Sequence, residues 1–230
     1  MTFKFPYDLI IFDCDGTLVD SEYLNNKISS DLLIEFGLTD YTPQRCIQEF
    51  AGVSWTTIKQ TLEARHDVEI PRDLVDNYIT RVNEAMTTLL KPIHGMLEFV
   101  VDCKAQTKIA VGSNGMRDNV WRSLELTGFL DHFTPEQIIT KIDVPNPKPA
   151  PDMFLMAANL VNANPQKCLV LEDSVTGTLA GNAAGMEVWG VMMASHGDEN
   201  DKINQKQKLI SAGASHVFED IIHMRKHLGI

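Results

Sequence analysis

Hydrophobic residues near the N-terminus form a continuous run from Leu9 to Phe12, without the alternation of apolar and polar positions that a half-exposed strand shows. Such a run is typical of a strand buried on both faces of a parallel sheet. From Met96 onward, apolar runs alternate with segments of helical periodicity. Strands are expected over 108–112, 138–139, 168–171, 187–191 and 216–218, and helices over 96–105, 117–126, 152–161, 175–184 and a last stretch ending near His227. Repeated strand–helix units predict an α/β fold built on a doubly wound, Rossmann-like parallel sheet.

Residues 19–92 show helical periodicity and no convincing strand. An apolar residue recurs at every fourth position from Leu24 to Phe36, which gives one apolar stripe to a helix that begins at Ser21. Three further helices are expected to begin near residues 43, 54 and 71. The predicted division is an α/β core of residues 1–18 and 93–230 with an inserted α-helical cap of residues 19–92.

The formal net charge of −11 at pH 7 and the pI near 5.0 argue against nucleic acid or an anionic membrane as the main partner. No apolar run reaches the length of a membrane span, and no signal-like segment opens the chain, so we expect a cytoplasmic protein. The four cysteines lack paired spacing, which disfavours a disulfide framework or a zinc site. We expect a monomer or a weak homodimer.

Two carboxylates, Asp13 and Asp15, follow the first strand, and Gly16 and Thr17 come next. The carboxyl end of a strand is where open α/β sheets bind ligands. Carboxylates this close repel each other unless a cation neutralises them, and magnesium accepts such hard oxygen ligands. A solvated Asp-Gly hairpin turn is the alternative, but the unbroken apolar strand before the pair argues against it.

Two later segments carry groups that could bind phosphate. Ser113 and Asn114 end a predicted strand, where a hydroxyl and backbone amides can hold phosphate oxygens. A helix-capping serine would look the same. Lys148 is flanked on both sides by proline, which stiffens the loop around the ammonium group, although most lysines are merely solvated.

A second acidic pair, Glu172 and Asp173, follows the predicted strand over 168–171. Its position repeats that of the first pair, at the carboxyl end of a buried strand. An aspartate that caps the next helix is the alternative interpretation. Together the two pairs predict a magnesium site at one edge of the sheet.

The run Asp-Cys-Asp-Gly-Thr from Asp13, the serine at 113, the Lys-Pro-Ala-Pro-Asp segment from Lys148 and the Glu-Asp pair at 172 resemble, in order, the four motifs of the haloacid dehalogenase superfamily. The resemblance covers the whole chain. Pro147 stands where this family often has glycine, a departure that concerns the local backbone and not the ammonium group. The resemblance implies a magnesium-dependent phosphatase of a small phosphorylated metabolite that forms an aspartyl-phosphate intermediate.

By the same resemblance, Asp13 attacks phosphorus and Asp15 acts as general acid and base. Asp13 would need no activating base, because a carboxylate is ordinarily ionised at neutral pH. The groups expected to hold phosphate oxygens are Ser113, the Asn114 amide and Lys148. The expected magnesium ligands are Asp13, the Asp15 backbone carbonyl, Asp173 and Glu172, the last either directly or through water.

The position of the helical insertion resembles the β-phosphoglucomutase-like branch of the family. Asn25, Ala51 and Trp55 stand where mutases of that branch carry a histidine and basic residues, which disfavours a mutase. Asp15 disfavours a dehalogenase, and Lys59 is expected to be a solvated helix lysine, not the Schiff-base lysine of phosphonatases.

The run from residue 13 to residue 22 and the Phe-Ala-Gly-Val loop at 50–53 resemble those of bacterial 6-phosphogluconate phosphatases. A sugar phosphate or sugar-acid phosphate is therefore the expected substrate. A phosphosugar mutase, a receiver-like module and a non-enzymatic phosphometabolite sensor remain open as alternatives. The helical insertion counts against a receiver, and the full set of catalytic groups counts against a sensor.

Overall fold

The computed structural model describes residues 5–50, 53 and 55–230, and it divides them into two compact units. The first unit comprises residues 5–20, 91–195 and 202–230. The second comprises the described part of residues 21–90 together with His196–Asp201. The sequence placed the inserted unit at 19–92, so the short second segment, which follows the fifth strand, was not anticipated.

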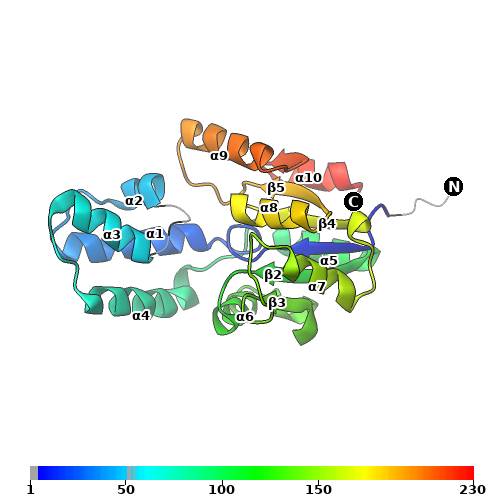
Figure 1. Cartoon of the computed structure of the whole chain (residues 1–230), viewed down its shortest axis with the longest axis horizontal. Helices are drawn as coiled ribbons and strands as arrows, with labels where there is room; N and C mark the ends of the chain where they lie inside the picture. The colour runs from blue at the N-terminus through cyan, green and yellow to red at the C-terminus, as the bar shows by residue number, and fades with distance from the viewer. Residues whose placement is uncertain (1–4, 51–52, 54) are drawn as a thin grey trace. The chain divides into compact units, whose positions relative to one another are not determined.

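Six parallel strands form one sheet in the described part of the first unit, in the order β3-β2-β1-β4-β5-β6 (Figure 1). Their bounds are β1 Leu9–Phe12, β2 Lys108–Ser113, β3 Ile138–Thr140, β4 Cys168–Glu172, β5 Glu187–Val191 and β6 His216–Phe218. β1 pairs with β2 on one side and β4 on the other, and Phe12 is in register with Val111 and Leu171. This sheet confirms the predicted doubly wound, Rossmann-like fold.

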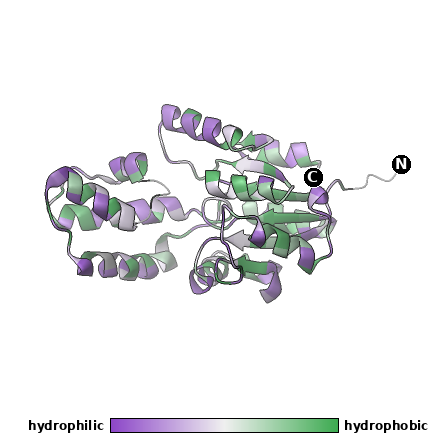
Figure 2. Ribbon diagram, viewed as in Figure 1, coloured by the Kyte–Doolittle hydropathy of each residue, from purple (hydrophilic) through white to green (hydrophobic). Residues whose placement is uncertain are grey.

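Both faces of β1 are buried, as its apolar run predicts, and Figure 2 shows the hydrophobic character of the strands. Leu9 and Ile11 pack in one cluster with Phe154 and Ala180, which come from the helices over that face. On the other face Phe12 makes edge-to-face contacts with Phe99 and Phe133, with ring centroids 6.3 and 6.4 Å away. Burying each such side chain contributes about 1.5–3 kcal/mol, so this core fixes the strand that ends at Asp13.

The helices of this unit follow the strands as the alternation predicts. Their bounds are α5 Met96–Gln106, α6 Arg117–Leu126, α7 Asp152–Leu160, α8 Val175–Ala183, α9 Glu199–Ser211, of which the part from Lys202 onward belongs to this unit, and α10 Ile221–Leu228. α9 was not among the predicted helices. Its one buried residue is Leu209, so the helix has no apolar stripe that periodicity could detect.

The second unit is helical, with α1 Ser21–Glu35, α2 Pro43–Phe50, α3 Trp55–His66 and α4 Arg72–Leu89. Buried apolar side chains include Leu24, Leu32 and Leu62, and the ring of Trp55 lies 5.1 Å from that of Tyr78. α1 ends before Phe36, the last residue of the predicted stripe.

One prediction for the helical unit, on Lys59, is corrected by the structure, and two others concern residues that the structure does not describe. Lys59 is not simply solvated: its Nζ donates to the Ile70 carbonyl oxygen at 2.7 Å and pairs with Glu63. These contacts engage the ammonium group and disfavour a Schiff-base role further. Ala51 and Ser54, used in the mutase comparison and as a helix start, are outside the described residues.

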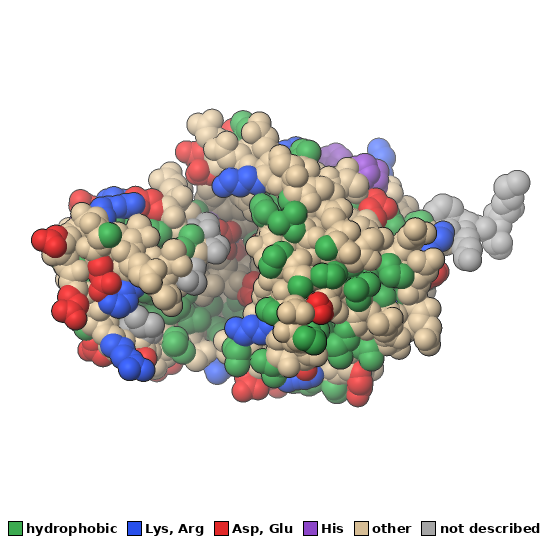
Figure 3. Space-filling model, viewed as in Figure 1, with side chains coloured by type: hydrophobic (Ala, Val, Ile, Leu, Met, Phe, Trp, Pro, Cys, Tyr) green, Lys and Arg blue, Asp and Glu red, His purple; other side chains and the backbone are tan. Residues whose placement is uncertain are grey.

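Charged side chains of both signs are interspersed on the face of the molecule that Figure 3 shows. None of the helices in the described part of the chain has the length and apolar character that a membrane crossing requires. The four cysteines are all buried and free. Burial raises the pKa of the Cys14 thiol, so the cysteine between the two aspartates of the first motif stays protonated at neutral pH.

Candidate active site

The carboxyl ends of β1, β2 and β4 meet at one edge of the sheet, because the three strands are adjacent and parallel. Asp13 directly follows β1, and its backbone N–H donates to the Leu171 carbonyl oxygen at 2.9 Å, which extends the pairing with β4. Ser113 is the last residue of β2, and Glu172 is the last residue of β4. The pairing of the three strands therefore brings Asp13, Ser113 and Glu172 to the same edge of the sheet.

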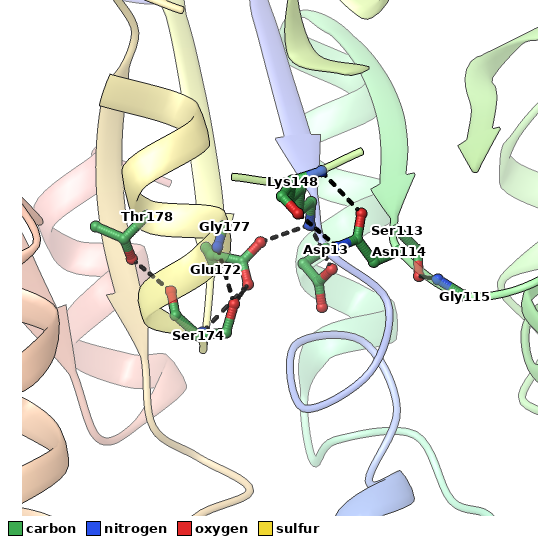
Figure 4. A network of polar contacts seen from close by, with 9 residues as sticks. All are labelled: Asp13, Ser113, Asn114, Gly115, Lys148, Glu172, Ser174, Gly177 and Thr178. Atoms are coloured by element: carbon green, nitrogen blue, oxygen red, sulfur yellow. Dashed lines mark hydrogen bonds and ion pairs between the residues drawn. The ribbon is translucent and has the colours of Figure 1, made fainter. Parts of the chain in front are cut away.

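Lys148 joins these strand ends through its side chain (Figure 4). Its Nζ lies 2.7 Å from Asp13 Oδ1 and 2.7 Å from Glu172 Oε2. The lysine side chain is only 3% exposed, so both ion pairs are almost free of solvent screening. Burial alone would lower the pKa of Lys148, but the two carboxylates outweigh it and raise that pKa, so the amine is charged. The ammonium group also lies 5.0 Å from the centre of the Phe154 ring.

Glu172 is held from its other side by Ser174. Glu172 Oε1 accepts hydrogen bonds from Ser174 N–H at 3.1 Å and from Ser174 Oγ at 2.6 Å. Ser174 is also the N-cap of α8, because its Oγ accepts from the Gly177 N–H at 3.0 Å. One serine thus ties the start of α8 to the carboxylate that faces Lys148 (Figure 4).

Carboxylate oxygens of Asp13, Glu172 and Asp173 all lie within 4.8 Å of one another. Burial, followed by the charge of Glu172, raises the pKa of Asp13 to about 8, although Lys148 opposes the shift. For Asp13 to be ionised at neutral pH, as the sequence predicted, its negative charge must be balanced by more positive charge than Lys148 alone provides. Three hard oxygen donors with an excess of negative charge are a fitting set for Mg²⁺.

Ser113 and Asn114 lie at the end of β2 as the sequence predicted. Ser113 Oγ is buried and accepts a hydrogen bond from the Gly115 N–H at 3.0 Å, which leaves its own proton for another acceptor. The Asn114 side chain contacts the Lys148 main chain through two hydrogen bonds. The sequence predicted a role only for the backbone amide of Asn114.

Asp15 is exposed and is not one of the three clustered carboxylates. Its Oδ2 lies 3.8 Å from the position that a Cβ atom would take at Gly115. The Asp15 carboxylate therefore lies near the loop after β2, and its charge contributes to the raised pKa of Asp13. An exposed carboxylate beside a buried one can exchange protons with solvent while its neighbour stays dry.

Ser174, which donates to Glu172, and Phe154, whose ring lies near the Lys148 ammonium group, were not among the predicted site residues. Ser174 has a local signal, since a serine that precedes a helical segment is a common N-cap, but nothing local connects it to Glu172. Phe154 has the appearance of an ordinary core residue of α7.

Comparison with known proteins gives the same family as the motifs. A profile of the family described as haloacid dehalogenase-like hydrolase matches residues 10–191. The 6-phosphogluconate phosphatase of Escherichia coli strain K12 is 30% identical over 183 residues, which cover 79% of this chain and 81% of that protein.

Two crystal structures are similar over nearly the whole chain. A conserved haloacid dehalogenase-like protein of unknown function from Agrobacterium tumefaciens strain C58 has a TM-score of 0.84 at 30% identity, covering 97% of this chain and 98% of that one. A HAD family hydrolase from Deinococcus radiodurans R1, with bound phosphate and sodium, has a TM-score of 0.82 at 31% identity, covering 98% and 96%.

Proposed function

The chain belongs to the haloacid dehalogenase-like hydrolases, and from this we propose that it is a magnesium-dependent phosphatase of a small phosphorylated metabolite. The observation that carries the proposal is the buried Lys148 ammonium, 2.7 Å from both Asp13 and Glu172 at the edge of the sheet. A carboxylate beside a fixed positive charge is what transfer of an anionic phosphoryl group requires, and this supports Asp13 as the nucleophile.

In the first step, a carboxylate oxygen of Asp13 attacks phosphorus and the bond from phosphorus to the leaving oxygen breaks. Asp15 donates a proton to that oxygen, so the alcohol leaves neutral. Lys148 has three N–H donors, of which two contact Asp13 and Glu172, and we assign the third to a phosphoryl oxygen. The Ser113 hydroxyl and the Asn114 amide hold the other oxygens.

In the second step, water attacks phosphorus of the aspartyl-phosphate. Asp15, now ionised, takes a proton from this water, and the bond between phosphorus and Asp13 breaks. Inorganic phosphate is released, and both carboxyl groups return to their starting states. The exposed position of Asp15 supports this double role, because the group must meet a leaving alcohol and then a water molecule.

We assign Mg²⁺ to Asp13, Asp173 and the Asp15 backbone carbonyl. The metal would offset the repulsion between the carboxylates and the phosphate. Both oxygens of Glu172 already accept hydrogen bonds, from Lys148 and from Ser174, so we assign Glu172 contact with the metal through water.

Replacing Gly16 with alanine is expected to raise the Mg²⁺ concentration for half-maximal activity by about 10–100-fold. Gly16 has φ +76°, and a Cβ atom there would lie 1.9 Å from Asp173 Oδ2, so the proposed ligand would be displaced. Magnesium titration of phosphate release measures the effect. Gly185→Ala is the matched control, because Gly185 has φ +73° but open space around its Cβ position. An unchanged magnesium requirement in Gly16→Ala would contradict the assignment of Asp173.

The helical unit is proposed to act as a cap that excludes water and selects the substrate. Similarity to a 6-phosphogluconate phosphatase supports a sugar-acid phosphate or sugar phosphate as the substrate class. The cytoplasmic location and the monomeric or weakly dimeric state stay predictions of the sequence.

The test is phosphate release from a panel of phosphorylated sugars, sugar acids and nucleotides, each with Mg²⁺ and with a chelator. We expect turnover of at least one sugar or sugar-acid phosphate that stops when the chelator is added. A folded protein that releases no phosphate but interconverts positional isomers of a sugar phosphate would instead be a mutase. A folded protein with neither of these two activities would instead be a sensor.

A further inference from the structure

The Asn114 side chain and the Lys148 main chain form a reciprocal pair of hydrogen bonds. Asn114 Nδ2 donates to the Lys148 carbonyl oxygen at 3.1 Å, and the Lys148 N–H donates to Asn114 Oδ1 at 3.0 Å. The two residues are 34 positions apart in the chain. Both polar groups of the Lys148 main chain are therefore satisfied by one side chain (Figure 4).

Few other main-chain bonds hold this loop. The prolines at 147, 149 and 151 have no N–H to donate, and Ala150 N–H donates at 3.0 Å to the Pro147 carbonyl oxygen within the same loop. Among the described residues, the two Asn114 bonds are the ones that join the Lys148 main chain to another part of the core. The two Asn114 bonds therefore attach the main chain of this proline-rich loop to the end of β2.

We propose that the Asn114 side chain is a positioning residue for the reaction, acting through Lys148, and this inference rests on the phosphatase proposed above. Asn114 fixes the main-chain end of Lys148, while Asp13 and Glu172 receive its ammonium group at the other end. A flexible four-carbon stem held at both ends keeps its third N–H donor in one direction. Asn114 thereby links the end of β2, where its amide meets phosphate, to the cation that meets the same phosphate.

The Asn114→Ala variant tests this role, because it removes both side-chain bonds and keeps the backbone amide. We expect kcat/KM to fall about 10–100-fold, since two hydrogen bonds and the placement of a charged group are lost. Asn146→Ala is the matched control. Asn146 is an exposed asparagine of the same loop, and its side-chain amide donates to Asp152 Oδ1 at 3.4 Å, away from the Lys148 main chain, so its removal should leave kcat/KM unchanged.

A double-mutant cycle with Lys148→Met separates positioning from general structural damage. If Asn114 acts through Lys148, adding Asn114→Ala to Lys148→Met should lower kcat/KM by less than about 3-fold. Binding of inorganic phosphate with Mg²⁺, measured by calorimetry, gives the same cycle for variants whose turnover is too slow. Thermal unfolding of each variant confirms that it is folded.

Equal losses from Asn114→Ala in both backgrounds, or wild-type activity in the single variant, would overturn the inference. Either result would leave the phosphatase intact, because the wild-type protein would still release phosphate. A wild-type protein that neither hydrolyses the panel nor binds phosphate would instead refute the proposed function itself.

Discussion

Asp13→Asn is expected to lower the rate of phosphate release by about 10⁴-fold or more, because the variant lacks the carboxylate that attacks phosphorus. Asparagine has the same shape and keeps an oxygen that can accept the hydrogen bond from Lys148 Nζ. The backbone N–H of residue 13 still donates to Leu171. The fold should therefore survive, and the loss should appear in kcat.

Asp8→Asn is the matched control for this experiment. Asp8 immediately precedes the same strand, at the end opposite to Asp13, and it is exposed. Its substitution makes the same chemical change far from the proposed nucleophile and should leave kcat unchanged. Steady-state phosphate release on the best substrate measures both variants. Retention of more than a tenth of wild-type activity in a folded Asp13→Asn protein would exclude Asp13 as the nucleophile.

Lys148→Met is expected to lower kcat/KM by about 10²–10³-fold, since a fixed cation at the phosphoryl group is lost. The same change should reduce the free energy of unfolding in chelator by about 3–5 kcal/mol, because Asp13 and Glu172 are left buried without their cation. Added Mg²⁺ should restore part of this stability by binding the folded state. Chemical denaturation with chelator and with Mg²⁺ measures both effects.

Lys141→Met is the control for the lysine substitution, because Lys141 is exposed a few residues before the same loop. Its effect on the free energy of unfolding should stay within about 0.5 kcal/mol. If Lys148→Met were as stable as the wild type in chelator, the two buried ion pairs would not contribute to the fold. If it were fully active, Lys148 would have no part in binding the phosphoryl group.

The fold follows from the sequence where a strand or helix is buried enough to leave an apolar pattern. Leu9 to Phe12 is buried on both faces, and its unbroken apolar run predicts this directly. The helix over Glu199–Ser211 buries only Leu209, so its hydrophobic pattern carries almost no signal. His196–Asp201 belongs with the helical unit through contacts between distant parts of the chain, which no local pattern reports.

The site residues were predictable because parallel strands end at a common edge. Asp13, Ser113 and Glu172 each lie at or directly after such an end, and they come together because the sheet order puts β1 between β2 and β4. Lys148 lies in a loop, and only its proline-flanked position and the family resemblance singled it out. The roles assigned to these residues stay proposals.

The side-chain contacts within the site were not predictable. The hydrogen bonds of Asn114 with the Lys148 main chain join residues 34 positions apart, and nothing in the local sequence of either residue predicts them. The raised pKa of Asp13 has the same origin. A carboxylate that looks ionised in the sequence becomes costly to ionise once the fold buries it beside Glu172.

The phosphoryl group is proposed to pass through Asp13, and trapping the covalent intermediate would detect this step itself. An Asp15→Asn variant should be mixed with an aryl phosphate and Mg²⁺ and quenched in acid at successive times. An aryl oxide leaves with little need of a proton, so the first step should proceed, whereas water attack without the Asp15 base should be slow. We expect mass spectrometry to find one phosphoryl group on the peptide that contains Asp13. Turnover with no phosphoryl group on that peptide at any time, or with the group on another residue, would exclude Asp13 as the nucleophile.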